Sequence, residues 1–167
     1  MTDLPSSLSA AATRADLSRL VAAINAATFE DSMHNMLSPE QWEVLASYLQ
    51  PVQLASGQVL FAQGSLDRTL YLVESGSLSI HYEDAKKRLR LAIVGPGALV
   101  GEGGFFSHRP RSATVQAGGA SLLWSLSALR HAELGNRQPA IALQLAMAAG
   151  SVLAKRLGDR RRRVAAT

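Results

Sequence analysis

The sequence predicts a mainly β, α+β fold in which an antiparallel β-roll or barrel is flanked by helices. Residues up to about 50 show helical spacing of apolar side chains, residues 52–125 form short β-type runs between glycine turns, and the chain from residue 127 is helical again. The gaps between the runs are too short for the helices of a Rossmann-type sheet. With 167 residues and 47% apolar side chains, the chain is expected to form one compact domain with a short appendage.

Two helices are predicted before the first strand, joined by a connector over residues 28–36. Thr13 and Asp16 give the first helix a start that resembles a capping box. Apolar residues then follow at helical spacing, namely Leu17, Leu20, Val21 and Ile24. This spacing places them on one face, which predicts an amphipathic helix.

The second helix has the clearer start signal. Ser38 is the expected N-cap, and Gln41 can reach back to it as the other half of a capping box. Leu37 and Trp42 stand where a hydrophobic staple would place them. Pro51 is expected to end the helix, because a proline disfavours the helical conformation of the residue before it.

The β region consists of short runs rich in Val, Leu, Ile and Tyr. The predicted strands are Gln58 to Phe61, Thr69 to Glu74, Leu78 to Tyr82, Leu89 to Val94, Ala113 to Ala117 and Ser121 to Trp124. Turns are predicted at Gly57, Gly64, Gly76, Gly95-Pro96-Gly97 and Gly118-Gly119. Many short strands with a glycine turn after each are typical of a closed antiparallel roll or barrel.

The C-terminal part predicts a short helix from Ser127 to Leu134, ended by Gly135, and a long helix over residues 139–157. The long helix carries two apolar stripes: Ile141, Leu145, Ala148 and Val152 in one, and Leu143, Met147, Gly150 and Ala154 in the other. A surface helix usually has one such stripe. The second stripe therefore indicates a partner, although burial of the whole helix inside one domain is the alternative.

Composition excludes several classes of protein. Cysteine is absent, which excludes disulfides, thiolate metal sites and cysteine nucleophiles. The net charge of +4 is concentrated in residues 155–163, which contain six basic side chains and one aspartate. The rest of the chain has a net charge of about −1. The N-terminus lacks the features of a secretory signal, and the uncharged stretches 112–129 and 138–154 are interrupted by polar residues, glycine or proline. We expect a cytoplasmic protein without membrane insertion.

Signals for an enzyme are missing as well. The four histidines lack metal-ligand spacing, and neither a nucleophile elbow nor a Walker motif occurs. The informative segment is residues 100–114, where a strand ends in small residues around Glu102 and a Pro-Arg-Ser leads into the next strand. Backbone N–H groups at the start of a short helix suit a phosphate, Arg111 can pair with it, and Ser112 adds a donor. The segment predicts an anion cradle.

This segment resembles the phosphate-binding cassette of the cyclic-nucleotide-binding domain family, typified by bacterial catabolite activator proteins and the regulatory subunits of cyclic-AMP-dependent protein kinase. The matching cassette residues are Gly101, Glu102, Gly104, Arg111, Ser112 and Ala113. The family's roll glycines are matched at Gly57, Gly64, Gly76 and Gly97, and its signature strand at Leu70 to Val73. The resemblance implies an eight-stranded, jelly-roll-like β-roll with N-terminal helices, a short cassette helix and a long C-terminal helix.

The resemblance also implies domain limits and residue roles. Residues 1–36 would be an N-terminal helical extension and 37–163 the domain, with the roll over about 52–125 and the C-terminal helices over about 127–160. The implied ligand is cyclic AMP or cyclic GMP, with no metal or other cofactor. Its phosphate would pair with Arg111, and its ribose 2′-hydroxyl with Glu102. The implied contacts are Gly101, Glu102, Gly103, Gly104, Arg111, Ser112 and Ala113, flanked by Val100, Thr114, Arg160 and Arg161.

The expected function is that of a regulatory sensor. Binding would be relayed to an unidentified effector protein through residues 139–157, which are also expected to form a homodimer. The C-terminal half is similar to modules fused to sulfate-permease-type transporters. Only four residues follow Arg163, so sequence-specific DNA binding is not expected. Two alternatives stay open: a ligand-free scaffold in which Arg111 and Glu102 form an internal salt bridge, and a weak nucleic-acid binder that uses the arginine run.

Overall fold

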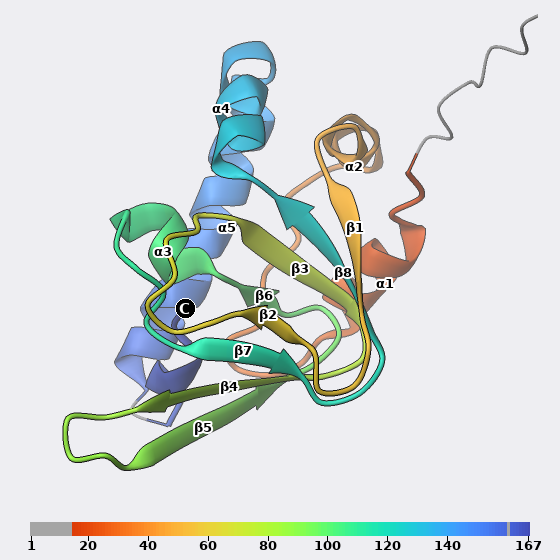
Figure 1. The fold of residues 1–167 in the computed structure, drawn as a ribbon. Coiled ribbons are helices and arrows are strands. Elements are labelled where there is room, and N and C mark those ends of the chain that lie inside the picture. Colours follow the sequence, from red (N-terminus) through yellow and green to blue (C-terminus); the bar gives the residue numbers. More distant parts are fainter. Residues whose placement is uncertain (1–14, 160) are drawn as a thin grey trace, which may run out of the picture.

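The computed structural model describes residues 15–159 and 161–167. Within these residues, eight antiparallel strands form two four-stranded sheets, and helices precede the first strand and follow the last one (Figure 1). The strands are β1 (Gln50–Leu54), β2 (Val59–Phe61), β3 (Leu70–Ser75), β4 (Leu78–Glu83), β5 (Leu89–Val94), β6 (Leu99–Val100), β7 (Thr114–Ala117) and β8 (Ser121–Leu126). The helices are α1 (Ser18–Ala26), α2 (Pro39–Ala46), α3 (Glu102–Ser107), α4 (Ala128–Arg137), α5 (Pro139–Gly158) and the 3₁₀ turn η1 (Arg163–Ala165). The predicted α+β roll is confirmed.

The sheets run in the orders β1-β8-β3-β6 and β2-β7-β4-β5, and every neighbouring pair is antiparallel. The structure has two short strands, β1 and β6, that the list of strands predicted from the sequence pattern does not include. Pro51 lies inside β1 instead of closing a helix, and α2 ends earlier, at Ala46. A proline is tolerated there because β1 is an edge strand. The N–H groups on the outer side of such a strand make no hydrogen bonds to a neighbouring strand, so a residue without an N–H is accepted.

The helix starts differ in how well they were predicted. Ser38 accepts a hydrogen bond from the N–H of Gln41, and the side chain of Gln41 accepts one from Ser38, so the capping box of α2 is confirmed. For α1, Thr13 lies outside the described residues. Asp16 accepts a hydrogen bond from the N–H of Ser18 over 2.9 Å, at the first turn of α1.

Two apolar clusters form the core. One fills the inside of the roll, with Val73, Leu78, Ile80, Val115 and Leu123 among its members. The other lies between the helices and the outer face of the β1-β8-β3-β6 sheet. Strand β3 contributes to both because Leu70 and Leu72 belong to the helix-side cluster, and Tyr71 and Val73 belong to the interior one. This sheet is therefore buried on both faces at β3.

The C-terminal helices follow the sequence closely. Helix α4 continues through Gly135 to Arg137, past the predicted end. The first apolar stripe of α5 is buried: Ile141, Leu145, Ala148 and Val152 are at most 5% exposed. In the second stripe, Leu143 and Met147 are 63% and 60% exposed, so full burial of the helix within the domain is excluded. Helix α5 is long and apolar enough to cross a membrane by length and composition, but its first stripe packs in the helix-side core.

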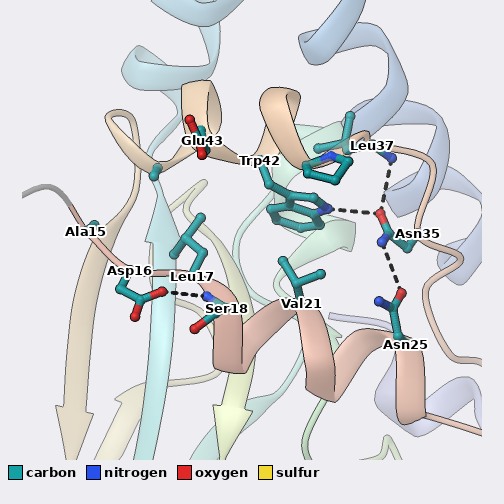
Figure 2. A pocket seen from close by; sticks show the side chains of 12 residues that line it. Ala15, Asp16, Leu17, Ser18, Val21, Asn25, Asn35, Leu37, Trp42 and Glu43 are labelled. Carbon is teal, nitrogen blue, oxygen red and sulfur yellow. Dashed lines mark hydrogen bonds between the residues drawn. The ribbon is translucent and has the colours of Figure 1, made fainter.

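A cavity of about 590 Å³ lies between α1 and α2 (Figure 2). Asn35 accepts hydrogen bonds from the indole N–H of Trp42 over 3.0 Å and the N–H of Leu37 over 3.1 Å, and it donates to Asn25 over 3.0 Å. The polar side chains at this end of the cavity thus tie α1, the connector and α2 together. The cavity is formed by the N-terminal helices and does not include the cassette.

Candidate functional site

The cassette turns sharply between β6 and α3. Gly101 connects them with a φ of +89°, in the left-handed region that favours glycine. A Cβ atom at this position would lie 2.6 Å from the carbonyl oxygen of Thr69 and 2.9 Å from Nη1 of Arg111. The glycine therefore permits both the backbone conformation and the close approach of Arg111 behind the turn.

Arg111 supports this turn from inside the protein. Its side chain is fully buried, donates from Nη1 to the Gly101 carbonyl over 2.9 Å, and donates from Nη2 to the Thr69 carbonyl over 2.6 Å. Nη2 also pairs with Asp67 over 2.6 Å, and the guanidinium lies 4.0 Å from the centre of the Phe61 ring. Burial opposes ionisation of Asp67, but hydrogen bonds from Arg111 and Thr69 outweigh it and lower the pKa of this carboxyl.

Glu102 belongs to a second, separate group of buried charges. Its carboxylate is fully buried and pairs over 2.8 Å with Nη1 of Arg156 from α5. Nε of Arg156 pairs over 2.8 Å with Asp31, which also accepts from Arg162. Burial opposes ionisation of Asp31, but the two arginines outweigh it and lower the pKa of this carboxyl. The Asp31–Arg156–Glu102 cluster links the N-terminal connector, the long helix and the cassette.

Arg111 and Glu102 thus have different partners among the described residues. Arg111 pairs with Asp67, and Glu102 pairs with Arg156. The internal salt bridge between Arg111 and Glu102 that the scaffold hypothesis invoked is not formed in the described part of the chain. The cassette is instead held by two separate ion-pair systems, Arg111–Asp67 and Arg156–Glu102.

The C-terminal segment, residues 163–167, occupies the cradle. Thr167 accepts hydrogen bonds from two cassette amides: its Oγ1 from the N–H of Gly101 over 2.7 Å, and its main-chain oxygen from the N–H of Gly104 over 2.9 Å. Glu102 accepts from the N–H of Thr167 over 3.2 Å and from its hydroxyl over 3.3 Å. Figure 1 marks the C-terminus near α3, in agreement with the hydrogen bond between Thr167 and Gly104.

The rest of this segment is anchored on both sides. The carbonyl of Ala166 accepts from the hydroxyl of Ser112 over 3.1 Å, and that of Ala165 accepts from Nη1 of Arg156 over 2.9 Å. The turn η1 lies against β4, β5 and α5. Ala165 and Thr167 are almost fully buried, and Ala165 belongs to the cluster inside the roll. The segment that follows the basic run therefore fills the cradle.

The remaining predicted site residues have varied positions. Val100 and Ala113 are buried, and the hydroxyl of Thr114 accepts from the N–H of Gln63 over 2.9 Å. Arg161 is exposed, with its N–H donating to Asp159. Arg160 lies outside the described residues. The basic run is not one surface, because Arg156 is fully buried and Arg162 pairs with the buried Asp31.

Sequence reasoning missed several residues at the site, namely Asp31, Phe61, Asp67, Arg156 and Thr167. A signal for Arg156 was present. It follows Val152 by four positions and so continues the buried stripe of α5, where an arginine needs buried partners. The others had no such signal, because their contacts join segments that are far apart in the chain.

Comparison with known proteins identifies the family to which the chain belongs. The model of the cyclic nucleotide-binding domain matches residues 51–137, which is more than half of the chain. The chain belongs to the cyclic nucleotide-binding domain family. The cyclic AMP receptor protein of Thermus thermophilus is 34% identical over 124 residues, which cover 74% of this chain and 56% of that protein. The chain thus spans about half the length of this relative.

Solved structures show the same fold. A cyclic nucleotide-binding domain from Methylobacillus flagellatus superimposes with a TM-score of 0.74 at 22% identity, covering 84% of this chain and 77% of that one. The regulatory domain of the Toxoplasma gondii cyclic-AMP-dependent kinase, crystallised with cyclic AMP, has a TM-score of 0.53 at 27% identity. This match covers 59% of the present chain and 38% of the other. The eight-stranded β-roll of the family is therefore confirmed.

Proposed function

We propose that the protein is a regulatory sensor that binds a cyclic mononucleotide in the cassette between β6 and β7. The observation that carries this proposal is the cradle itself. Two cassette amides, those of Gly101 and Gly104, already donate to oxygen atoms of one residue, with the buried cation of Arg111 directly behind them. Amides so directed, backed by a guanidinium, suit the oxygens of a ring-closed phosphate.

Glu102 would take the ribose 2′-hydroxyl. Its carboxylate now accepts from the N–H and the hydroxyl of Thr167, so its oxygens face the position where a ligand would lie. An ionised carboxylate accepts hydrogen bonds and cannot donate them. A sugar hydroxyl can donate, so it is a matching partner. Arg156 would hold the carboxylate in this orientation through the 2.8 Å ion pair.

Cyclic AMP is our first candidate ligand, and cyclic GMP is the second. The similarity to a cyclic AMP receptor protein and to a kinase regulatory domain crystallised with cyclic AMP favours the adenine nucleotide. Ser112 follows the cassette arginine, and its hydroxyl already donates to a carbonyl of the C-terminal segment. The same hydroxyl would donate to the bound phosphate in either ligand.

We also propose that the signal leaves through α5, in a cytoplasmic protein without catalytic activity. Arg156 links this helix directly to Glu102 in the cassette, so a change at the ligand reaches the helix through one side chain. On the outer face of α5, Leu143 and Met147 are exposed and form an apolar surface for a second copy or an effector. This is the proposed dimer surface of residues 139–157.

A second candidate function is favoured by one observation. Because Thr167 fills the cradle with good hydrogen bonds, the protein could be a ligand-free scaffold of the same fold. Nucleic-acid binding through the basic run has less support, because Arg156 and Arg162 are committed to Asp31. Sequence-specific DNA binding is not part of the proposal.

The test is calorimetry and thermal unfolding of the full chain with cyclic AMP and cyclic GMP, and with linear 5′-AMP as the control. At a ligand concentration one hundred times the Kd, binding should stabilise the protein by about 2.7 kcal/mol. We expect Arg111→Ala to weaken binding about tenfold or more, since a charge-assisted hydrogen bond contributes about 1.5–3 kcal/mol. Because Arg111 is buried, Ser112→Ala serves as the milder variant. No heat and no stabilisation with any cyclic nucleotide, including cyclic dinucleotides, would support the scaffold instead.

A further inference from the structure

Residues 163–167 contact the cassette in the same way that a ligand would. They supply acceptors to the Gly101 and Gly104 amides, a donor pair to Glu102, and an acceptor to Ser112. Each of these cassette groups is one that the proposed function assigns to the nucleotide. A cyclic nucleotide and this segment therefore cannot occupy the cradle together.

Gly103 explains how the segment fits. A Cβ atom added to this glycine would lie 2.8 Å from the main-chain carbonyl carbon of Thr167 and 3.0 Å from its oxygen. Side-chain carbons do not approach backbone atoms this closely. The missing side chain at Gly103 thus makes room for the C-terminal segment, although glycine costs a helix about 1 kcal/mol relative to alanine.

We propose that residues 163–167 are an internal ligand that closes the cradle, and that a cyclic nucleotide binds by displacing them. This rests on the proposed function and adds its regulation. Arg156 couples the two states, because it donates both to the carbonyl of Ala165 in the segment and to Glu102 in the cassette. When the segment is displaced, Arg156 loses its hydrogen bond to Ala165 and keeps its ion pair with Glu102. The contacts of α5 therefore differ between the two states.

The size of the effect follows from the populations. If the segment is docked in about nine molecules of ten, the apparent Kd for an external ligand is raised about tenfold. Variants that evict the segment should therefore bind cyclic AMP about tenfold more tightly than the native chain. An ordinary damaged site would show the opposite change.

Two variants of the full chain test the proposal from opposite sides. Gly103→Ala removes the space for Thr167 from the cassette side. Its matched control is Gly135→Ala in α4, where the same change meets only Ala142 at 3.9 Å. Ala165→Glu removes the fit from the segment side, because Ala165 is fully buried within the roll. Its control is Ala85→Glu on the exposed β4–β5 loop. Both test variants should gain about tenfold in affinity for cyclic AMP, and Ala165→Glu should do so although its added charge repels an anion.

Amide hydrogen exchange gives a readout that does not depend on a nucleotide. The first N–H groups of a helix have no partner in the helix, so protection of the Gly104 amide reports that the main-chain oxygen of Thr167 is docked on it. We expect slow exchange at Gly101 and Gly104 in the native chain and its two controls, and fast exchange in both test variants. Fast exchange in the native chain, or affinities in the test variants within about twofold of native, would overturn the proposal.

The failure of the two proposals can be told apart. If cyclic nucleotides bind neither the native chain nor the variants, the proposed function fails, and displacement fails with it. The exchange rates then still decide whether the segment is docked. If nucleotides bind all chains equally, the proposed function stands and the internal ligand is refuted.

Discussion

Arg156 is the side chain on which the buried charge cluster depends, and Arg156→Met is the perturbation that tests it. Methionine keeps much of the length of the side chain but removes the cation that pairs with Asp31 and Glu102, each over 2.8 Å. Both carboxylates are almost fully buried, at 2% and 0% exposure. A buried carboxylate without its cation pays a desolvation penalty that its remaining hydrogen bonds only partly offset.

Removing one partner of a buried ion pair costs about 3–5 kcal/mol. Here the lower end applies, because Asp31 keeps Arg162 and Glu102 keeps the N–H and hydroxyl of Thr167. We expect a loss of about 3 kcal/mol in the free energy of unfolding, which corresponds to a Tm lower by about 6–12 °C in a chain of this size. The double variant Arg156→Met/Glu102→Gln should recover part of this loss, because the unpaired charge is removed.

The assay is urea unfolding followed by the fluorescence of Trp42 and Trp124, which are both buried in the helix-side core. The matched control is Arg130→Met, which breaks the partly exposed pair with Glu133 and should cost only about 0.2–1 kcal/mol. If Arg156→Met costs no more than this control, the cluster does not stabilise the fold. If the double variant shows no recovery, Glu102 is not the source of the loss.

Two further predictions concern acid and the surface of α5. The pKa values of Asp31 and Asp67 lie below the usual 3.8. Their contribution to stability is therefore complete above that pH and is lost as pH falls through the lower folded-state values. Unfolding free energies measured from pH 5 downward should show this loss, and Asp31→Asn should make the free energy depend less on pH. If α5 is the dimer surface, Met147→Lys should convert the dimer to monomers, as measured by light scattering. The control Leu129→Lys on α4, where the leucine is 71% exposed, should leave the dimer intact. A native chain that is monomeric with and without nucleotide contradicts the dimer.

Local patterns predicted much of the fold. The capping box at Ser38, the glycine turns and the apolar stripe of α5 all act within a few residues, so the sequence displays them directly. The short strands β1 and β6 were missed for a different reason. They exist because they pair with β8 and β3, which are distant in the chain, and Pro51 in β1 resembles a helix end in isolation.

The site was predictable only as far as its motif extends. The cassette from Gly101 to Ala113 could be located, but the ionic partners Asp67 and Asp31 lie 44 and 125 positions away from the arginines that they pair with. The role of Thr167 had no sequence signal at all. Only the packing of Thr167 against Gly103 connects this glycine with the segment that it accommodates.

The most direct test of the account is an NMR titration of the full chain with cyclic AMP that follows the amides of Gly101, Gly104 and Thr167. We expect all three signals to change together and to saturate at the same ligand concentration, with Thr167 acquiring the narrow line of a released segment. Signals of Gly101 and Gly104 that stay unchanged at millimolar cyclic AMP would contradict nucleotide binding in the cradle. Saturation of these two signals with Thr167 unchanged would contradict displacement.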